Sequence, residues 1–394
     1  MGDILSQRGD RGTGRWPRWV AMLAVLVLAT VLIVEHLPHH PSARTGARRT
    51  AVTVVPLTGP AAGPAGVSGP AMPRDDSLRL PVTGQQPAWL WPATGRMQLI
   101  GGLPRDRSGY RFIRLAGGWA VQANPAAQLR CGSCAGPRLP VYFLADHAQS
   151  VTLAGTANEV APGAAAGAMW LTSYPPDADM STAAGTAQEI SVASAPAGPR
   201  LRLPAGYVIY QGTDRGLLLA PAAPSGTATY KLWSPAAPRA VSRTFDGVLA
   251  ASARQIAWAT RCDPVCRVEV LDLATGQHTV ISLPGASSAV NGAFSPDGKF
   301  LTLQVSFSNL GDDGELAMQL DVVSMASGNL AAVPAIRVSS DALVDFGWPV
   351  GSDDLVAELN FIAKLQVASW RPGARRLAVA DISPGPESTS LIVG

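Results

Sequence analysis

Four cysteines are the residues of this chain whose spacing points most directly to chemistry. They form two close pairs, Cys131 with Cys134 in CGSC and Cys262 with Cys266 in CDPVC. In a reducing compartment such pairs typically bind zinc, and a CxxC pair within a βαβ pattern takes part in thiol redox exchange. In an oxidising compartment they form disulfides. No βαβ pattern surrounds CGSC, so the choice between zinc and disulfides depends on the compartment.

The N-terminal segment indicates that compartment. An uncharged apolar run extends from Trp19 to Val34 and, with its flanks, approaches the ~20 residues that cross a bilayer. Several arginines precede it. We therefore predict a short cytoplasmic tail over residues 1–18 and a transmembrane signal anchor over residues 19–37, with the rest of the chain extracytoplasmic. A cleaved signal peptide is the alternative, but cleavage-site candidates such as Thr45-Gly46-Ala47 are weak.

Residues 38–75 are rich in Pro, Gly and Ala and show no lasting apolar periodicity. Such a composition cannot bury enough apolar surface to offset the conformational entropy of the chain. We predict a disordered linker here that spaces the following domain from the membrane. His36, His39 and His40 lie at its start, and without acidic or thiol neighbours they are expected to be solvated.

Residues 76–394 repeat a unit of short strands separated by turns. The clearest hairpin turns end in a glycine, as the left-handed position of such turns requires: Gly95, Gly276, Gly328 and Gly373. Units end near seven positions spaced about 45 residues apart, the length of a four-stranded propeller blade: Trp91, Leu144, Tyr174, Trp233, Leu273, Met325 and Trp370. No long helical pattern interrupts them. We therefore predict an all-β domain, a β-propeller of seven four-stranded blades.

A propeller must close its ring, because an open array would leave exposed strand edges. The alternating residues of 78–82 are expected to form the outer strand of the last blade, beside the segment 377–382. Five tryptophans that fall within strand patterns are expected to fill the spaces between blades: Trp119, Trp170, Trp258, Trp348 and Trp370.

The repeats also place the cysteines. Each pair precedes the same strand of its own unit, and equivalent loops of different blades lie apart around a ring. We therefore predict two local disulfides, Cys131–Cys134 and Cys262–Cys266, in an extracytoplasmic domain.

Two motifs in the later units resemble the repeats of TolB-like and WD-type (WD40-like) β-propellers. Ser295-Pro296-Asp297-Gly298-Lys299 precedes a strand, and Leu271-Asp272-Leu273-Ala274-Thr275-Gly276 ends the preceding unit. With its predicted anchor, the chain resembles membrane-anchored TolB-like proteins of high-GC Gram-positive bacteria. TolB itself carries an additional N-terminal α/β domain, which no part of this sequence resembles. The resemblance implies extracytoplasmic binding of a protein or ligand.

Other candidate chemistry is sparse. The net charge of +3, with scattered arginines, does not form the basic face that nucleic-acid binding needs. His147 and His278 are isolated, no G-x-S-x-G or phosphate-binding loop is present, and the acidic loop 311–315 lacks EF-hand spacing. We therefore expect no catalytic residue, metal or cofactor.

The expected function is that of a non-catalytic binding or scaffold module in the cell membrane, with an unknown protein or peptide partner at the propeller face. The alternative is a propeller enzyme, lyase or lactonase-like, with a metal at the axis. That enzyme would need several His, Asp or Glu residues on the inner strands, and the strands assigned there are mostly Ala, Val, Phe and Trp.

Overall fold

The computed structural model describes most of the chain from residue 49 onward. The described ranges are 49–53, 66–74, 78–83, 86–105, 109–123, 134–191, 198–223, 227–237, 243–260, 262, 265–307, 317–326, 330–339, 342–349, 352–361 and 364–382. The predicted tail and transmembrane anchor, most of the predicted linker and the acidic loop 311–315 lie outside them. No helix in the described ranges has the length and apolarity of a membrane span.

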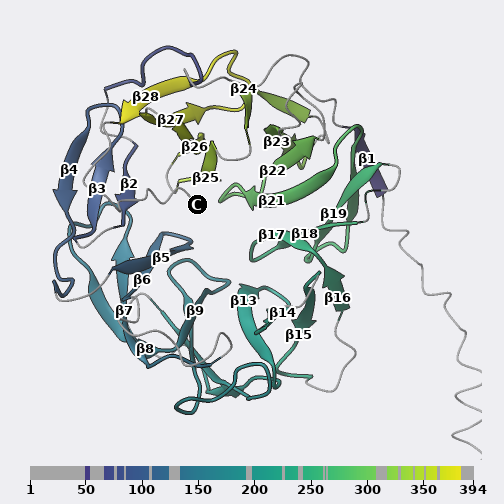
Figure 1. Ribbon diagram of the computed structural model, residues 1–394. Coiled ribbons are helices and arrows are strands. Elements are labelled where there is room, and N and C mark those ends of the chain that lie inside the picture. Colours follow the sequence, from purple (N-terminus) through teal and green to yellow (C-terminus); the bar gives the residue numbers. More distant parts are fainter. Residues whose placement is uncertain are drawn as a thin grey trace, which may run out of the picture. The chain divides into compact units, whose positions relative to one another are not determined.

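The unit that begins at Arg48 is all-β, and its seven sheets are arranged around a ring (Figure 1). This confirms the predicted seven-bladed β-propeller. In each blade the strands follow one another from the axis to the rim (Figure 1). The strands, blade by blade, are β2(Leu80–Val82), β3(Ala88–Trp91) and β4(Arg96–Leu99); β5(Tyr110–Leu115), β6(Gly118–Ala123), β7(Leu139–Ala145) and β8(Thr152–Ala157); β9(Glu159–Pro162), β10(Met169–Ser173), β11(Thr186–Ile190) and β12(Leu201–Arg202); β13(Tyr207–Thr213), β14(Gly216–Pro221), β15(Thr229–Trp233) and β16(Arg243–Asp246); β17(Val248–Ala251), β18(Gln255–Ala259), β19(Cys266–Asp272) and β20(His278–Leu283); β21(Ser288–Phe294), β22(Phe300–Phe307), β23(Ala317–Ser324) and β24(Leu330–Ser339); β25(Leu343–Gly347), β26(Leu355–Phe361), β27(Lys364–Trp370) and β28(Ala378–Ile382).

Two blades depart from the expected four strands. The first blade has three in the described part of the chain, β2 to β4. The fifth blade gains an additional outer strand, because β1(Arg49–Thr53) pairs in parallel with β20. This strand comes from the region that composition assigned to the linker, so local composition did not reveal a pairing partner far along the chain.

The turn at Ser295 shows how the sequence encodes a blade. The Ser295 hydroxyl donates to Asp297 Oδ1 at 2.7 Å and accepts from the Phe300 amide at 2.9 Å. Gly298 has a φ of +70°, which a residue with a side chain rarely adopts. The turn returns the chain antiparallel, so that Phe294 pairs with Leu301.

The core is divided into seven apolar clusters, each shared by two neighbouring blades. Strand side chains alternate between the two faces of a sheet, so each blade contributes side chains to the cluster on either side of it. The five tryptophans expected between blades all belong to these clusters: Trp119, Trp170, Trp258, Trp348 and Trp370. Trp348 of the last blade also donates its indole N–H to Thr302 of the preceding blade at 2.9 Å.

The ring closes differently from the prediction. The segment 78–82 does not form the outer strand of the last blade, because β2 pairs with β3 in the first blade. The seam is sealed by side-chain packing, in which Leu80, Val82 and Leu90 contact Val356 and Val367. An earlier segment, residues 66–74, runs along the outer edge of β28 instead, and we call it the strap. Alternation alone could not distinguish the two segments, since either presents apolar residues to the last blade.

Candidate functional site

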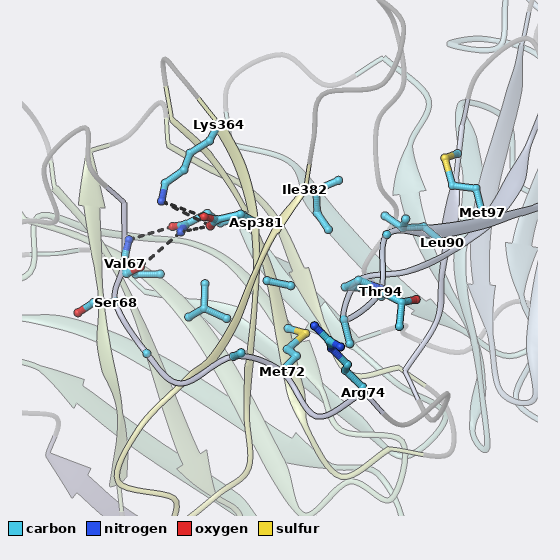
Figure 2. A pocket seen from close by; sticks show the side chains of 18 residues that line it. Val67, Ser68, Met72, Arg74, Leu90, Thr94, Met97, Lys364, Asp381 and Ile382 are labelled. Carbon is cyan, nitrogen blue, oxygen red and sulfur yellow. Dashed lines mark hydrogen bonds and ion pairs between the residues drawn. The ribbon is translucent and has the colours of Figure 1, made fainter.

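A groove of about 700 Å³ lies between the strap, the last blade and the first blade (Figure 2). Its walls come from three stretches of sequence: the strap, the β3–β4 hairpin and the strands β27 and β28. The groove arises where the ring closes. At this seam the last blade, with β28 at its rim, lies beside the first blade, and the strap on the outer edge of β28 extends the wall of the groove.

The strap is held by backbone pairing and by one glutamine side chain. The Met72 amide donates to the Val379 carbonyl at 3.1 Å, and the Val379 amide donates to the Pro70 carbonyl at 2.9 Å. Gln366 Oε1 accepts from the Val67 amide at 3.0 Å, while its Nε2 donates to the Val67 carbonyl at 3.4 Å. The glutamine amide thus bonds the strap in the manner of a neighbouring strand.

Glycines allow this close approach. A Cβ atom at Gly69 would overlap the carbonyl oxygen of Leu377, and one at Gly66 would overlap Gln366 Oε1. Gly66 also has a φ of +88°. The glycines that made this region look like a linker are therefore the residues that let it lie against β28.

One end of the groove is charged. Lys364 Nζ lies 3.4 Å from Asp381 Oδ1, and the pair is drawn in Figure 2. The hydrogen bond from Gln366 Nε2, 2.6 Å long, and the charge of Lys364 lower the pKa of Asp381. Asp381 is therefore ionised at neutral pH and bound on two sides.

The rest of the groove has a mixed lining, in which Arg74, Ser68 and Thr94 alternate with apolar side chains (Figure 2). Leu90, Val379 and Ile382 lie along its wall, and Met72 and Met97 add flexible thioethers. Met97 is 52% exposed although it is large and apolar. A concave surface that combines apolar side chains with convergent polar and charged groups is typical of a binding site, and methionines adapt to varied partners.

The structure gives the following outcome for the cysteines. Cys262 and Cys266 are joined in a disulfide, as predicted, which links the loop after β18 to the first residue of β19. Cys134 is also disulfide-bonded, and Cys131, its predicted partner, lies outside the described residues. The bonded sulfurs of Cys134, Cys262 and Cys266 offer no thiolate to zinc.

The histidines are not brought together. His147 is exposed in the turn after β7, with a φ of +68°. His278 lies in β20, where its Nε2 is 3.1 Å from Glu269 Oε2 and its ring packs against Trp258. No group of three or more His, Cys, Asp or Glu residues that could hold a metal gathers among the described residues. His36, His39 and His40 lie outside them.

The inner strands match the expected composition only in part. Trp119, Trp170 and Trp258 lie on the second strands β6, β10 and β18, one position outward from the axis. The innermost strands β17 and β21 consist largely of Ala, Val and Phe, whereas β5, β9 and β25 carry charged residues. Arg111 of β5 is one of these, and its Nη1 is 3.3 Å from Glu159 Oε2 of the neighbouring blade. Blade strands are so short that the pattern does not reveal which one of a unit is innermost.

The groove residues escaped the sequence analysis. Met97, Lys364 and Asp381 each look like ordinary strand residues, and the strap looked like linker. The sequence did contain one indication that the strap is ordered, because Val67 and Met72 are apolar residues within a glycine-rich and proline-rich stretch. Only the tertiary contacts give them a partner.

No protein-family model matches the chain, and a search of curated proteins found no match. Solved structures do match at low identity. One is a prolyl endopeptidase structure, 10% identical with a TM-score of 0.53, aligned over 77% of this chain and 47% of its own, so the chain spans about half the length of that protein. TolB from Acinetobacter baumannii is 11% identical with a TM-score of 0.38, over 76% of each chain. A protein from Lactobacillus plantarum is 10% identical with a TM-score of 0.41, over 78% of this chain and 100% of its own.

The solved structures similar to this chain thus include TolB and other β-propeller proteins. At these identities the likeness concerns the fold alone. The expected membrane anchor and bacterial origin stay predictions.

Proposed function

We propose that this chain is an extracytoplasmic, membrane-anchored β-propeller that binds an extended segment of a partner protein in its seam groove and catalyses no reaction. The strap carries this proposal, because it is an extended peptide seated on the edge of β28. The groove lies directly beside that contact. A second extended chain would find apolar, polar and charged side chains along the same wall.

We favour an extended peptide over a small molecule as the ligand. Extended peptides bind by backbone hydrogen bonds and by side chains placed in apolar recesses, without covalent chemistry. The Lys364–Asp381 pair offers one anchor of each charge at one end of the groove. The exposed Met97 at the other end can adapt to an apolar side chain.

A site-specific photo-crosslinker tests the proposal. The crosslinking amino acid replaces Met97 in the full-length chain, expressed in its native host and irradiated in intact cells. Val290 provides a matched control, because it is 49% exposed against 52% for Met97 but lies on β21 of another blade. We expect an adduct at position 97 only, mapped by mass spectrometry to one short segment of one protein.

A synthetic peptide of the captured segment should compete with the adduct, and Lys364→Ala combined with Asp381→Ala should reduce it. Equal adducts at positions 97 and 290, or failure of the peptide to compete, would refute the groove as the binding site.

The alternative of a propeller enzyme has its own test. Metal analysis of the purified full-length chain, before and after chelation, measures whether an ion is held in stoichiometric amount. A stoichiometric ion whose removal leaves the fold intact would favour the enzyme over the binding module.

A further inference from the structure

The first blade is one strand short at its rim. Each of the other six blades has at least four strands, whereas the first blade has only β2, β3 and β4 in the described part of the chain, with β4 at its outer edge (Figure 1). Its neighbours extend further outward, with β8 on one side and β28, covered by the strap, on the other. The place of a fourth strand beside β4 therefore lies between two wider blades.

The backbone of β4 directs hydrogen-bonding groups toward that place. The Ile100 amide donates inward to the Pro87 carbonyl at 2.9 Å, whereas the next amide, that of Gly101, donates outward to a carbonyl of the second blade at 2.8 Å. Successive residues of a strand alternate between its two edges. The N–H and C=O groups of Met97 and Leu99 are in phase with those of Gly101 and therefore point outward, where no strand of the described ranges pairs with them.

Exposed apolar side chains surround the same place. Met97, Leu99 and Leu153 are 52%, 54% and 57% exposed, and they are three of the five large apolar side chains that are exposed among the described residues. Met97 pairs with Leu90, which packs against the last blade, so Met97 and Leu99 face that blade. Leu153 of β8 lies two residues after Val151, which packs against the first blade, so Leu153 faces the first blade from the other side. A strand beside β4 would thus meet apolar side chains on both of its faces.

These surroundings define the chain that fits. A strand that is buried on both faces carries a continuous apolar run rather than an alternating one. Exposed strand edges with apolar neighbours invite aggregation, and native proteins cover them. A second copy of the propeller would contact β8 and the strap before its own sheet reached β4, so a single extended chain fits better.

The sequence that follows β28 contains such a run. Residues 383–394, which lie outside the described ranges, read SPGPESTSLIVG, with three consecutive apolar residues at 391–393. β28 ends at Ile382, which lines the seam groove together with the β3–β4 hairpin, from which β4 starts. Residues 383–387 extend up to ~17 Å, long enough to pass from one wall of the groove to the other.

Connectivity gives the direction of the added strand. In an antiparallel blade the turn from second to third strand lies at the opposite end from the turn between third and fourth strands. β28 starts at a turn of the latter kind, so it ends at the end of the ring where the β3–β4 hairpin lies. A chain that continues from Ile382 therefore enters at the first residue of β4 and runs parallel to it.

We propose that residues 388–393 of this chain add to the outer edge of β4 as a parallel fourth strand. Leu391 and Val393 then extend the apolar row on the groove side of β4. Ile392 points the other way, toward Leu153. The added strand closes the rim of the first blade, and it does so whether or not a partner lies in the groove.

Hydrogen exchange of single amides in the full-length chain tests the proposal, with mass spectrometry and backbone fragmentation as the measurement. We expect the Met97 and Leu99 amides to exchange at least about tenfold more slowly than in a chain truncated after Glu387, because truncation removes their acceptors. The Gln98 amide is the internal control. It points inward to β3, so its rate should stay unchanged and shows that the truncated blade is folded.

Two variants and a peptide assign the protection to the tail. Leu391→Asp should abolish it without truncation, because the variant places a charge against the apolar row. Ser383→Asp is the matched control, with the same added charge in the same tail but outside the proposed strand, and should leave the protection intact. A synthetic peptide of residues 388–394, added to the truncated chain, should restore it.

Fast exchange of the Met97 and Leu99 amides in the intact chain would overturn the proposal, since the edge of β4 would then be open. Protection that survives truncation would overturn it as well, and a dependence of that protection on chain concentration would identify a second copy as the occupant. Neither result bears on the groove. In the crosslinking experiment above, an adduct of position 97 with residues 388–394 of the same chain would support the tail strand and count against a partner protein.

Discussion

Asp321 makes the stability of the propeller fall as pH rises, the reverse of the usual behaviour of carboxylates. It lies in β23, is 0% exposed, and accepts a 2.7 Å hydrogen bond from Gln319 on Oδ1. Its Oδ2 is buried and has no hydrogen-bond partner within the described residues. Burial raises the pKa of Asp321 to about 6, although the Gln319 hydrogen bond opposes the rise.

The sign follows from linkage. The pKa is higher in the folded than in the unfolded protein, so the folded state binds the proton more tightly. The contribution of Asp321 is therefore most favourable below its ordinary pKa of 3.8 and is lost as pH rises through 6. A shift of about two units corresponds to ~3 kcal/mol in full, of which ~2 kcal/mol is lost between pH 4.5 and 8.

The substitution Asp321→Asn removes the titration and keeps an acceptor for Gln319. We expect the free energy of unfolding of the variant, relative to the parent, to increase by ~2 kcal/mol between pH 4.5 and 8. Urea unfolding of the full-length chain at three pH values, followed by tryptophan fluorescence, measures it. Taking the difference between variant and parent cancels the other titrating groups.

Asp297 supplies a comparison of opposite sign. Partial burial raises its pKa, but hydrogen bonds from Lys299 and Ser295 prevail and bring the pKa to about 2. Its contribution is present above pH 3.8 and is lost as pH falls toward 2, so Asp297→Asn should cost stability at neutral pH. The reasoning would be refuted if the free energy of unfolding of Asp321→Asn, relative to the parent, did not change with pH. It would also be refuted if this difference fell as pH rises, as it should for Asp297→Asn.

Three further predictions concern packing, the strap and the disulfide. Thr302→Val leaves the buried Trp348 indole N–H without its acceptor and should lower the free energy of unfolding by ~1–3 kcal/mol, measured by urea unfolding; a loss under half of that would mean that another acceptor is in reach. Gly69→Ala should displace the strap, because its Cβ would overlap the Leu377 carbonyl, and hydrogen exchange at the Met72 and Val379 amides should accelerate, whereas Ser68→Ala, at an exposed strap residue, should not change it. Unchanged exchange in Gly69→Ala would contradict the docking of the strap. Replacing Cys262 and Cys266 by Ser should cost only ~2 kcal/mol, because so short a loop restricts the unfolded chain little, and a loss of folding would mean that the bridge does more than this.

Much of the fold was predictable because blades are local structures. Each hairpin is formed by neighbouring residues, and its turn needs a few specific residues, such as Ser295, Asp297 and Gly298. The repeat length then predicted seven blades, which the seven sheets confirm, and the apolar alternation of the strands required burial on both sides. The tryptophans between blades followed from the same pattern.

The candidate sites were not predictable in this way. The groove depends on a strap that pairs with β28 about 300 residues later, through Met72 and Val379, and the glycines that permit the pairing are the ones that suggested a linker. A small cavity brings together Arg79, Arg114 and Asp146 from three separate stretches of the chain, none of which forms a motif.

The sequence by itself determined the short strands, the turns between them, the repeat and one confirmed disulfide, because each depends on residues close together in the chain. Only the tertiary structure decided which strand is innermost, which segment covers the last blade, and which charges share a cavity. Those features depend on where the closing ring brings distant segments, and their pairing energies are absent from any local stretch of the chain.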